Sequence, residues 1–345
     1  MKLLVSALEP SSNLHLKEVL KHTQDIELIG IFDKTIKNST PLYDISQMAI
    51  MGVVDAIKKL RWFYKVADEM VELAKEADKI LLMDSSGFNL PLAKKLKTAY
   101  PEKEIIYYIL PQIWASRPKR AKKLERYCDK LLGVLPFEVE YYQSKAQYIG
   151  HPLLDEINIT EHTKTDTIAF MPGSRKSEIK RLLPIFKEVR QKLSKKKAIL
   201  IIPSSFSQEK INSLYGDISM FEISKDTHTS LATAEFAFIC SGTATLEAAL
   251  IGTPFTLSYI AKKIDFFIGT KLLGIKQVGL ANIILTNYNN STLHNEILQE
   301  DVTVDNLLKE YEKTNRDIFS KKAEELRAYL AHGSSENVAK ILMQP

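Results

Sequence analysis

Cysteine is scarce in this chain, and long apolar runs are missing. Cys128 and Cys240 are the only cysteines, and no Cys-x-x-Cys pair or Cys/His cluster accompanies them. A disulfide framework or a zinc site is therefore not indicated, and both are expected to be small buried side chains. No apolar run approaches the ~18 residues of a membrane span, and the chain starts with a strand pattern rather than a signal peptide, so a cytoplasmic protein is expected.

The charge balance excludes little by itself. The sequence holds 47 basic and 42 acidic residues, for a formal charge of +5. This mild excess suits phosphate ligands or an acidic membrane face. The lysines are scattered along amphipathic helices, and no DNA- or RNA-binding module is present, so no nucleic-acid partner is expected.

The length and pattern predict two α/β halves. A chain of 345 residues exceeds the usual size of one core, and strand and helix patterns alternate over residues 2–149 and again over 167–259. Residues 150–152 and the polar stretch 158–167 mark the boundary. We expect domains over residues 1–155 and 156–325, and a C-terminal helix in 326–345 that packs back on the first domain or on a partner's.

Two loops in the second half have the composition of an anion site. One follows a strand at 167–171, the other a strand at 236–240, and both contain glycine and hydroxyl residues before a helix. Ligands bind at the carboxyl ends of parallel strands, where glycine permits close approach and helix-start N–H groups point outward. The predicted nucleotide-diphosphate site comprises Gly173, Ser174, Arg175, Ser241, Gly242, Thr243 and Thr245, with Glu247 one turn further on to accept ribose hydroxyls.

A plainer interpretation of these loops stays open. Ser241, Thr243 and Thr245 also suit helix capping, Arg175 also suits the surface, and Glu247 could pair with a lysine. Neither loop has the Walker A ending or a Gly-x-Gly-x-x-Gly pattern. Phosphoryl transfer and dinucleotide redox chemistry are therefore disfavoured.

Two carboxylates end strands in the first half. Asp84 follows a strand at residues 79–83, and Glu9 follows the first strand. A carboxylate there is placed to take a proton from a bound hydroxyl, or instead to cap the following helix.

The order of several motifs resembles the lipid-A-disaccharide synthase family over nearly the whole chain. The matching segments are residues 49–54, 84–94, 108–115 with Arg117 and Arg120, 135–138, 149–153, 171–175, 241–247 and 280–283. The resemblance implies a GT-B architecture of two Rossmann-like domains whose parallel sheets face a central cleft. It also implies an inverting glycosyltransferase that joins UDP-2,3-diacylglucosamine to 2,3-diacylglucosamine 1-phosphate, forms the β-1,6 disaccharide of lipid A and releases UDP.

The resemblance further implies roles for single residues. Asp84, Glu9 and Arg175 match catalytic positions, and Asn282 joins the nucleotide-sugar site. Acceptor or lipid contacts are implied for Ser11, Asn89, Met51 and Gln112. The scheme needs no metal and no cofactor. A homodimer stays open.

Two departures from the family pattern stand out. Where the family reads Gly-Glu-Ala-Ser-Gly-Asp after the first strand, residues 8–13 read Leu-Glu-Pro-Ser-Ser-Asn. Close backbone approach of a ligand there is put in doubt. Gly87 replaces a second acid, so Asp84 is the sharper candidate for the base.

A lipid substrate needs an apolar landing surface, and the resemblance favours peripheral contact with the inner face of the cytoplasmic membrane. Residues 57–65 and 262–268 interleave basic with aromatic side chains, as in interfacial segments. Trp62, Phe63, Phe266 and Phe267 are the predicted contacts. The alternative is an amphipathic helix whose aromatic side chains face the core.

Three rival functions stay open at this point. A peptidoglycan glucosaminyltransferase and a UDP-sugar epimerase share the two-domain UDP-sugar chemistry. A non-catalytic nucleotide-sugar or membrane-binding module is the rival of another class, and loss of turnover with retained UDP binding in an Asp84→Asn variant would separate the enzyme from it.

Overall fold

The computed structural model describes residues 1–36, 39–47, 56–157, 165–261 and 277–344. The chain divides into two compact units. The first comprises Met1–Glu156 and Leu330–Pro345, and the second comprises Ile157–Tyr329.

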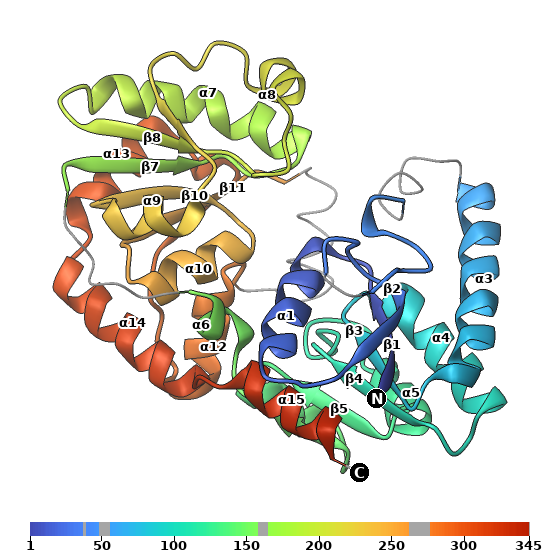
Figure 1. Cartoon of the computed structure of the whole chain (residues 1–345). Helices are drawn as coiled ribbons and strands as arrows, with labels where there is room; N and C mark the ends of the chain where they lie inside the picture. Colours follow the sequence, from blue (N-terminus) through green and yellow to red (C-terminus); the bar gives the residue numbers. More distant parts are fainter. Residues whose placement is uncertain (37–38, 48–55, 158–164, 262–276, 345) are drawn as a thin grey trace. The chain divides into compact units, whose positions relative to one another are not determined.

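The first unit is built on a six-stranded parallel sheet in the order β2-β1-β3-β4-β5-β6 (Figure 1). Its strands are β1 (Lys2–Ala7), β2 (Glu27–Ile31), β3 (Lys79–Met83), β4 (Glu104–Tyr108), β5 (Lys130–Gly133) and β6 (Ala146–Tyr148). Ala7 pairs with Met83, and Met83 with Tyr108. The loops that follow β1, β3 and β4 therefore start side by side at one edge of the sheet.

Helices cover both faces of this sheet. On one face lie α3 (Ala56–Leu73), α4 (Ser86–Ala99) and α5 (Lys119–Tyr127), and on the other lie α1 (Pro10–Lys21), α6 (Pro152–Glu156) and α15 (Ser334–Met343) (Figure 1). Short 3-10 helices span Ala74–Glu76 and Pro136–Tyr141. The carboxylate of Asp155 accepts the N–H groups of Gly333 and Ser335, both at 2.8 Å, which fixes the start of α15.

The second unit repeats the plan with the strand order β12-β11-β10-β7-β8-β9. The strands are β7 (Thr167–Met171), β8 (Lys197–Ile201), β9 (Glu222–Ser224), β10 (Phe236–Cys240), β11 (Phe255–Tyr259) and β12 (Glu296–Leu298). Ile239 pairs with Met171, so the loops after β7 and β10 begin next to each other.

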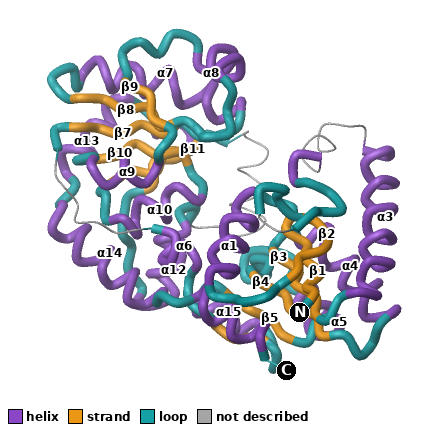
Figure 2. Tube along the Cα trace, viewed as in Figure 1, coloured by secondary structure: helices purple, strands orange, loops and turns teal. Residues whose placement is uncertain are grey.

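Its helices also form two layers, seen around the strands in Figure 2. One layer holds α7 (Lys176–Lys192), α8 (Gln208–Tyr215) and α13 (Val304–Lys313); the other holds α9 (Thr227–Thr233), α10 (Thr243–Ile251) and α12 (Leu280–Asn289). A 3-10 turn at Gln299–Asp301 and α14 (Arg316–Leu330) complete the unit. Under α7, the Phe170 ring stacks on Phe238 at 5.4 Å between centroids and contacts Phe186 at 5.8 Å.

The predicted α/β class with two parallel sheets is confirmed. Runs rich in Val, Ile, Leu and Phe form strands buried on both faces, as expected where helices cover a parallel sheet. The three-residue strand β12 was not predicted, because a strand that short carries no readable alternation. Residues 137–143, expected as a helix, form the 3-10 turn Pro136–Tyr141.

Candidate functional site

A cavity of about 540 Å³ opens at the carboxyl ends of β7, β8 and β10 in the second unit. The predicted residues among its walls are Gly173, Ser174, Arg175, Ser241, Gly242, Thr243 and Glu247. Sequence reasoning missed five further wall residues with a charged or hydroxyl side chain: Glu178, Ser204, Ser205, Lys225 and Thr227. The last four follow β8 and β9 at the same sheet edge. The generalisation that ligands bind at the carboxyl ends of parallel strands would therefore have found them.

Gly173 shapes the first loop. Its φ of 102° lies in the left-handed region, and a Cβ there would come within 2.6 Å of a Glu178 carboxylate oxygen. Any other side chain would therefore be both strained and obstructed. Glycine thus allows the chain to turn tightly from β7 into α7.

Glu178 organises the donors of this loop. Its Oε2 accepts the N–H groups of Ser174 at 3.2 Å and Arg175 at 3.1 Å, and its Oε1 accepts Arg175 Nη1 at 2.6 Å. The Glu178 side chain is only 8% exposed, whereas that of Arg175 is 77% exposed. The hydrogen bond that the Arg175 guanidinium donates to Glu178 raises the pKa of Arg175.

This arrangement corrects one expectation. The Ser174 and Arg175 N–H groups were expected to be free for an anion, but Glu178 already engages them in a capping box. The donor that this loop presents to the cavity is the Arg175 guanidinium. Its planar fork suits phosphate oxygens.

The second loop presents backbone donors instead. Helix α10 begins at Thr243 after the N-cap Gly242, and no side chain caps it. Nothing lies within 4 Å of a Cβ built on Gly242. An uncapped helix start with open space before it favours an anionic group. Thr245, in contrast, is fully buried and donates to the Gly242 carbonyl oxygen at 2.7 Å, so it supports the turn from beneath.

Glu247 and Asn282 differ in their placement. Glu247 lines the cavity, and its Oε2 lies 3.7 Å from His228 Nε2. Asn282 is buried on α12, where it donates to the His294 carbonyl and Glu296 and accepts the Leu293 N–H. It holds α12 to the segment before β12 and does not line the cavity.

A second cavity, of about 520 Å³, lies at the carboxyl ends of β1 and β3 in the first unit. It is lined by Leu8, Glu9, Leu60, Phe63, Asp84, Ser85, Ser86, Gly87 and Phe88. Two carboxylates therefore share the cavity with an apolar wall. Such a mixture suits a ligand with a polar head and an apolar chain.

Asp84 is held in a strained loop. Its φ is 47° and that of Ser85 is 37°, so two successive residues other than glycine adopt the left-handed conformation. The Asp84 N–H donates to the Tyr108 carbonyl at 3.0 Å, and its own carbonyl accepts from the Tyr107 hydroxyl and, at 3.1 Å, from Asn89 Nδ2. Strain that surrounding bonds maintain is typical of functional sites.

The electrostatics of Asp84 suit a base. Burial raises the pKa of its carboxyl group, while the Ser85 N–H and the charge of His15 oppose this shift. A higher pKa means a stronger affinity for a proton taken from a hydroxyl. Asp84 does not cap α4, whose N-cap is Ser85.

Asn89 is buried and positions this loop. Its Oδ1 accepts the Ser6 hydroxyl at 2.6 Å, and its Nδ2 donates to the Met83 carbonyl at 2.8 Å as well as to Asp84. These bonds occupy its amide group. Asn89 therefore acts on the Asp84 loop from below and does not line the cavity.

Glu9 stands at the rim. It is exposed at the N-cap of α1, where its side chain makes no capping bond, and its Oε1 lies 3.4 Å from the Ser85 hydroxyl. Ser11 and Gln112 are exposed but are not among the residues lining the cavity. Met51 lies outside the described residues.

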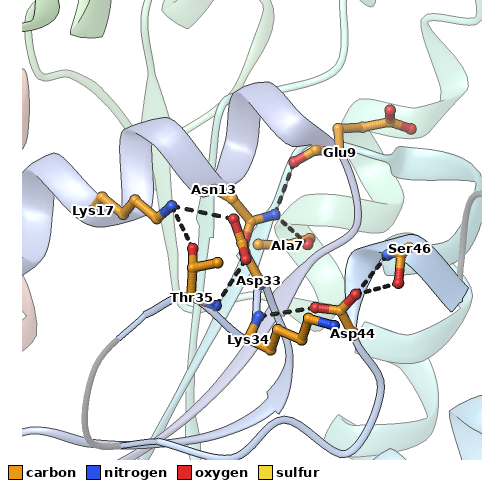
Figure 3. Close-up of polar contacts among 9 residues, drawn as sticks. All are labelled: Ala7, Glu9, Asn13, Lys17, Asp33, Lys34, Thr35, Asp44 and Ser46. Atoms are coloured by element: carbon orange, nitrogen blue, oxygen red, sulfur yellow. Dashed lines mark hydrogen bonds and ion pairs between the residues drawn. The ribbon is translucent and has the colours of Figure 1, made fainter. Parts of the chain in front are cut away.

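Asn13 explains one departure from the family pattern. Its Nδ2 donates to the Ala7 and Glu9 carbonyls at 2.8 and 2.9 Å, and its Oδ1 accepts the Asp33 N–H at 2.8 Å (Figure 3). A carboxylate cannot donate these bonds. The amide thus ties the end of β1 and the start of α1 to the end of β2.

The predicted membrane aromatics on α3 are half-buried. The Trp62 ring packs edge-on against Tyr43 at 5.4 Å and Phe63 at 5.2 Å, and Phe63 contacts Phe88 at 5.5 Å. Among the α3 side chains from residue 60 onward, the large apolar ones that are exposed are Leu60, at 58%, and Tyr64, at 54%. Phe266 and Phe267 lie outside the described residues.

Comparisons with known proteins agree with this geometry. A profile of the lipid-A-disaccharide synthetase family matches residues 3–344. The lipid-A-disaccharide synthase of Helicobacter pylori strain J99 is 51% identical over 352 residues, covering 98% of this chain and 96% of that protein. The synthase of Campylobacter jejuni strain RM1221 is 46% identical over 361 residues, covering 98% of each.

The chain belongs to the lipid-A-disaccharide synthetase family.

The family assigned from the motifs is thus confirmed, and with it a glycosyltransferase rather than a non-catalytic module. Solved structures show the same fold: UDP-bound MnaA of S. aureus has a TM-score of 0.62 at 11% identity, covering 99% of this chain and 95% of its own. The spinosyn rhamnosyltransferase SpnG, complexed with thymidine diphosphate, has a TM-score of 0.61 at 10% identity, covering 99% and 100%.

The exchange Asn13→Asp tests whether the Asn13 amide stabilises the junction of β1, α1 and β2. Two donors that face carbonyls become acceptors, so the free energy of unfolding should fall by roughly 1–3 kcal/mol. Denaturant unfolding measures this change. As a control, Asn287→Asp alters an exposed amide that bonds the Ile283 carbonyl and should cost much less. Equal effects of the two exchanges would contradict the role given to Asn13.

Proposed function

We propose that this chain transfers the sugar of UDP-2,3-diacylglucosamine to the 6-hydroxyl of 2,3-diacylglucosamine 1-phosphate, with inversion and release of UDP. The observation that carries the proposal is the pairing of chemistries in the two cavities. One presents Arg175 and an uncapped helix start, which suit a diphosphate. The other presents a half-buried carboxylate beside apolar side chains, which suits an acylated alcohol.

The second unit is the donor domain in this proposal. The diphosphate of the donor accepts hydrogen bonds from the Arg175 guanidinium and from N–H groups in the first turn of α10. Glu247 accepts from the ribose hydroxyls. As the bond between the sugar and the diphosphate breaks, negative charge grows on the leaving oxygen, and donors already in place stabilise it.

The first unit is the acceptor domain. Asp84 takes the proton of the 6-hydroxyl while the oxygen attacks the anomeric carbon of the donor sugar. A new C–O bond forms, the bond to UDP breaks, and the proton stays on Asp84 until solvent removes it. Attack from the face opposite UDP inverts the anomeric carbon and yields the β linkage.

The apolar wall of the Asp84 cavity accommodates acyl chain. Leu8, Leu60, Phe63 and Phe88 line the side of the cavity nearest α3 and the start of α4. Burial of a methylene group contributes about 0.8 kcal/mol, so even a short length of chain would bind strongly. This wall separates a diacylated acceptor from the unacylated sugars of an epimerase.

Replacement of Asp84 by Asn tests the base. Turnover should fall by about 10²–10⁴-fold, because the amide cannot accept the hydroxyl proton. The affinity for UDP, measured by calorimetry, should be unchanged because the diphosphate residues are intact. Glu9→Gln, at the exposed rim, should cause a smaller loss. Full activity in the Asp84 variant would refute its role.

We also propose peripheral attachment to the inner face of the cytoplasmic membrane through α3. Leu60 and Tyr64 are exposed there next to the exposed cations Arg61 and Lys65, and Leu60 also lines the acceptor cavity. Apolar side chains flanked by cations suit an anionic bilayer surface. No helix in the described part of the chain is long and apolar enough to cross a membrane.

The double exchange Leu60→Ser and Tyr64→Ser should weaken binding to anionic phospholipid vesicles by about tenfold or more, since two apolar contacts are lost. Sedimentation with vesicles measures the bound fraction. These exposed positions are preferable to Trp62 and Phe63, whose replacement would disturb packing. Ile318→Ser, an exposed apolar position in the second unit, is the control. Unchanged sedimentation of the α3 variant would exclude this surface.

A further inference from the structure

Helix α5 and the turn before it carry several basic side chains that form no ion pair with a carboxylate in the described part of the chain. The basic residues are Arg117, Lys119, Arg120, Lys122, Lys123 and Arg126. Glu125 is the only acid in α5, and it accepts backbone N–H groups of Gln143 and Ser144. Within the described ranges, no carboxylate forms an ion pair with any of the six. Concentrated like charge is unfavourable without an anionic partner.

Arg120 differs from its neighbours. It is half-buried, whereas Arg117, Lys119, Lys122, Lys123 and Arg126 are exposed. Its Nη1 donates to the Ser86 hydroxyl at 2.6 Å, and Ser86 is both the first residue of α4 and part of the acceptor cavity wall. One edge of the guanidinium is thereby tied to the loop that holds Asp84.

Other observations place the charge of Arg120 near the same loop. The pKa of Tyr107 is raised mainly by burial, and the positive charge of Arg120 opposes that shift. Tyr107 is the residue whose hydroxyl donates to the Asp84 carbonyl. At Gly87, next to Ser86, a Cβ would meet no atom within 4 Å, so the wall is open there.

The acceptor cavity itself needs a cation for a phosphorylated ligand. Its charged wall residues in the described chain are Glu9 and Asp84, both acidic. A phosphate monoester that entered beside two carboxylates would be repelled by several kcal/mol at close range in a partly buried site. The Arg120 guanidinium is bonded to Ser86, one of the wall residues, so it opposes this repulsion and offers a bidentate fork.

We infer that Arg120, aligned by Ser86, binds the phosphate monoester of the acceptor sugar. This inference rests on the proposed function and adds a residue that selects the phosphorylated acceptor. Arg120 is preferred over the exposed cations because one edge is already held, so less side-chain freedom is lost on binding. The exposed cations of α5 raise the local concentration of anions without contacting the phosphate.

The test compares two acceptors that differ only in the phosphate. Steady-state kinetics in mixed detergent micelles would use 2,3-diacylglucosamine 1-phosphate and the same sugar with a free 1-hydroxyl. For Arg120→Gln we expect kcat/KM to fall roughly 10- to 100-fold with the phosphorylated acceptor, the range for a lost charged hydrogen-bond pair. It should change less than about twofold with the other acceptor, and the KM for the UDP-sugar should stay the same.

Two further variants make the result interpretable. Arg120→Lys keeps the charge and can still donate to Ser86 but loses the fork, so a smaller, equally selective loss is expected. Lys123→Gln removes one of the five exposed charges around the same helix, so kcat/KM should change by less than about twofold with either acceptor. Thermal unfolding of each variant checks the fold, and the lysine variant serves if the glutamine variant does not fold.

Equal losses with both acceptors would overturn the inference and assign Arg120 a structural role through Ser86. The inference would also be overturned if Arg120→Gln and Lys123→Gln lowered kcat/KM equally, and only with the phosphorylated acceptor. The summed positive charge of α5, rather than Arg120 itself, would then attract the phosphate. A wild-type protein that transfers sugar to neither acceptor would refute the proposed function. A wild-type protein that is active, with insensitive Arg120 variants, would refute this inference alone.

Discussion

The ion pair between Arg175 and Glu178 determines which hydrogen-bond donors the proposed donor cavity can offer to an anion. A carboxylate buried at a phosphate site would ordinarily oppose binding. Here its charge is satisfied by two backbone N–H groups and one guanidinium nitrogen, so Gly173 and Arg175 are fixed before any ligand arrives. Arg175 lines the same cavity as the uncapped start of α10. Prior orientation of donors is what makes charge stabilisation effective in a leaving-group site.

The loop that holds Asp84 is also fixed by hydrogen bonds from surrounding residues before any ligand binds. Asp84 and Ser85 adopt unfavourable backbone conformations, and Asn89, Tyr107 and the Tyr108 carbonyl hold them there. None of these three bonds uses the Asp84 carboxylate. The protein therefore stabilises the loop through its backbone and leaves the acid available for chemistry. In each unit the residues that shape the loop are buried, while the residue proposed to act is exposed to the cavity.

The sequence predicted the architecture and the loops well, because both depend on local patterns. Buried strands read as apolar runs, and glycine followed by hydroxyl residues at a strand end indicates an anion-binding turn. The contacts of Glu178 with the start of α7 were not predicted, because Arg175 at the N-cap is not the Ser, Thr, Asp or Asn that marks a capping box in a sequence. Long-range partners were not predictable. Nothing in the sequence distinguishes the buried Asn89 and Asn282, whose amides are occupied, from asparagines that contact a ligand.

The same limit applies to the aromatics of α3. Periodicity indicated an amphipathic helix, but only packing against Tyr43 and Phe88 shows that Trp62 and Phe63 face inward. The exposed positions Leu60 and Tyr64 follow from that orientation. Arg120 is a similar case: its place in a family motif was evident, and its bond to Ser86 supplied a reason for it.

The most direct test of the central claim is the affinity of UDP for the Arg175→Gln variant, measured by isothermal titration calorimetry. Loss of a charge-assisted contact to the diphosphate should raise the Kd of UDP about 10- to 100-fold and leave the weak binding of uridine, which lacks phosphates, unchanged. Lys180→Gln, an exposed cation on the same helix, should bind UDP like the wild type. Wild-type affinity in the Arg175 variant would contradict the account, because the diphosphate would then be held elsewhere.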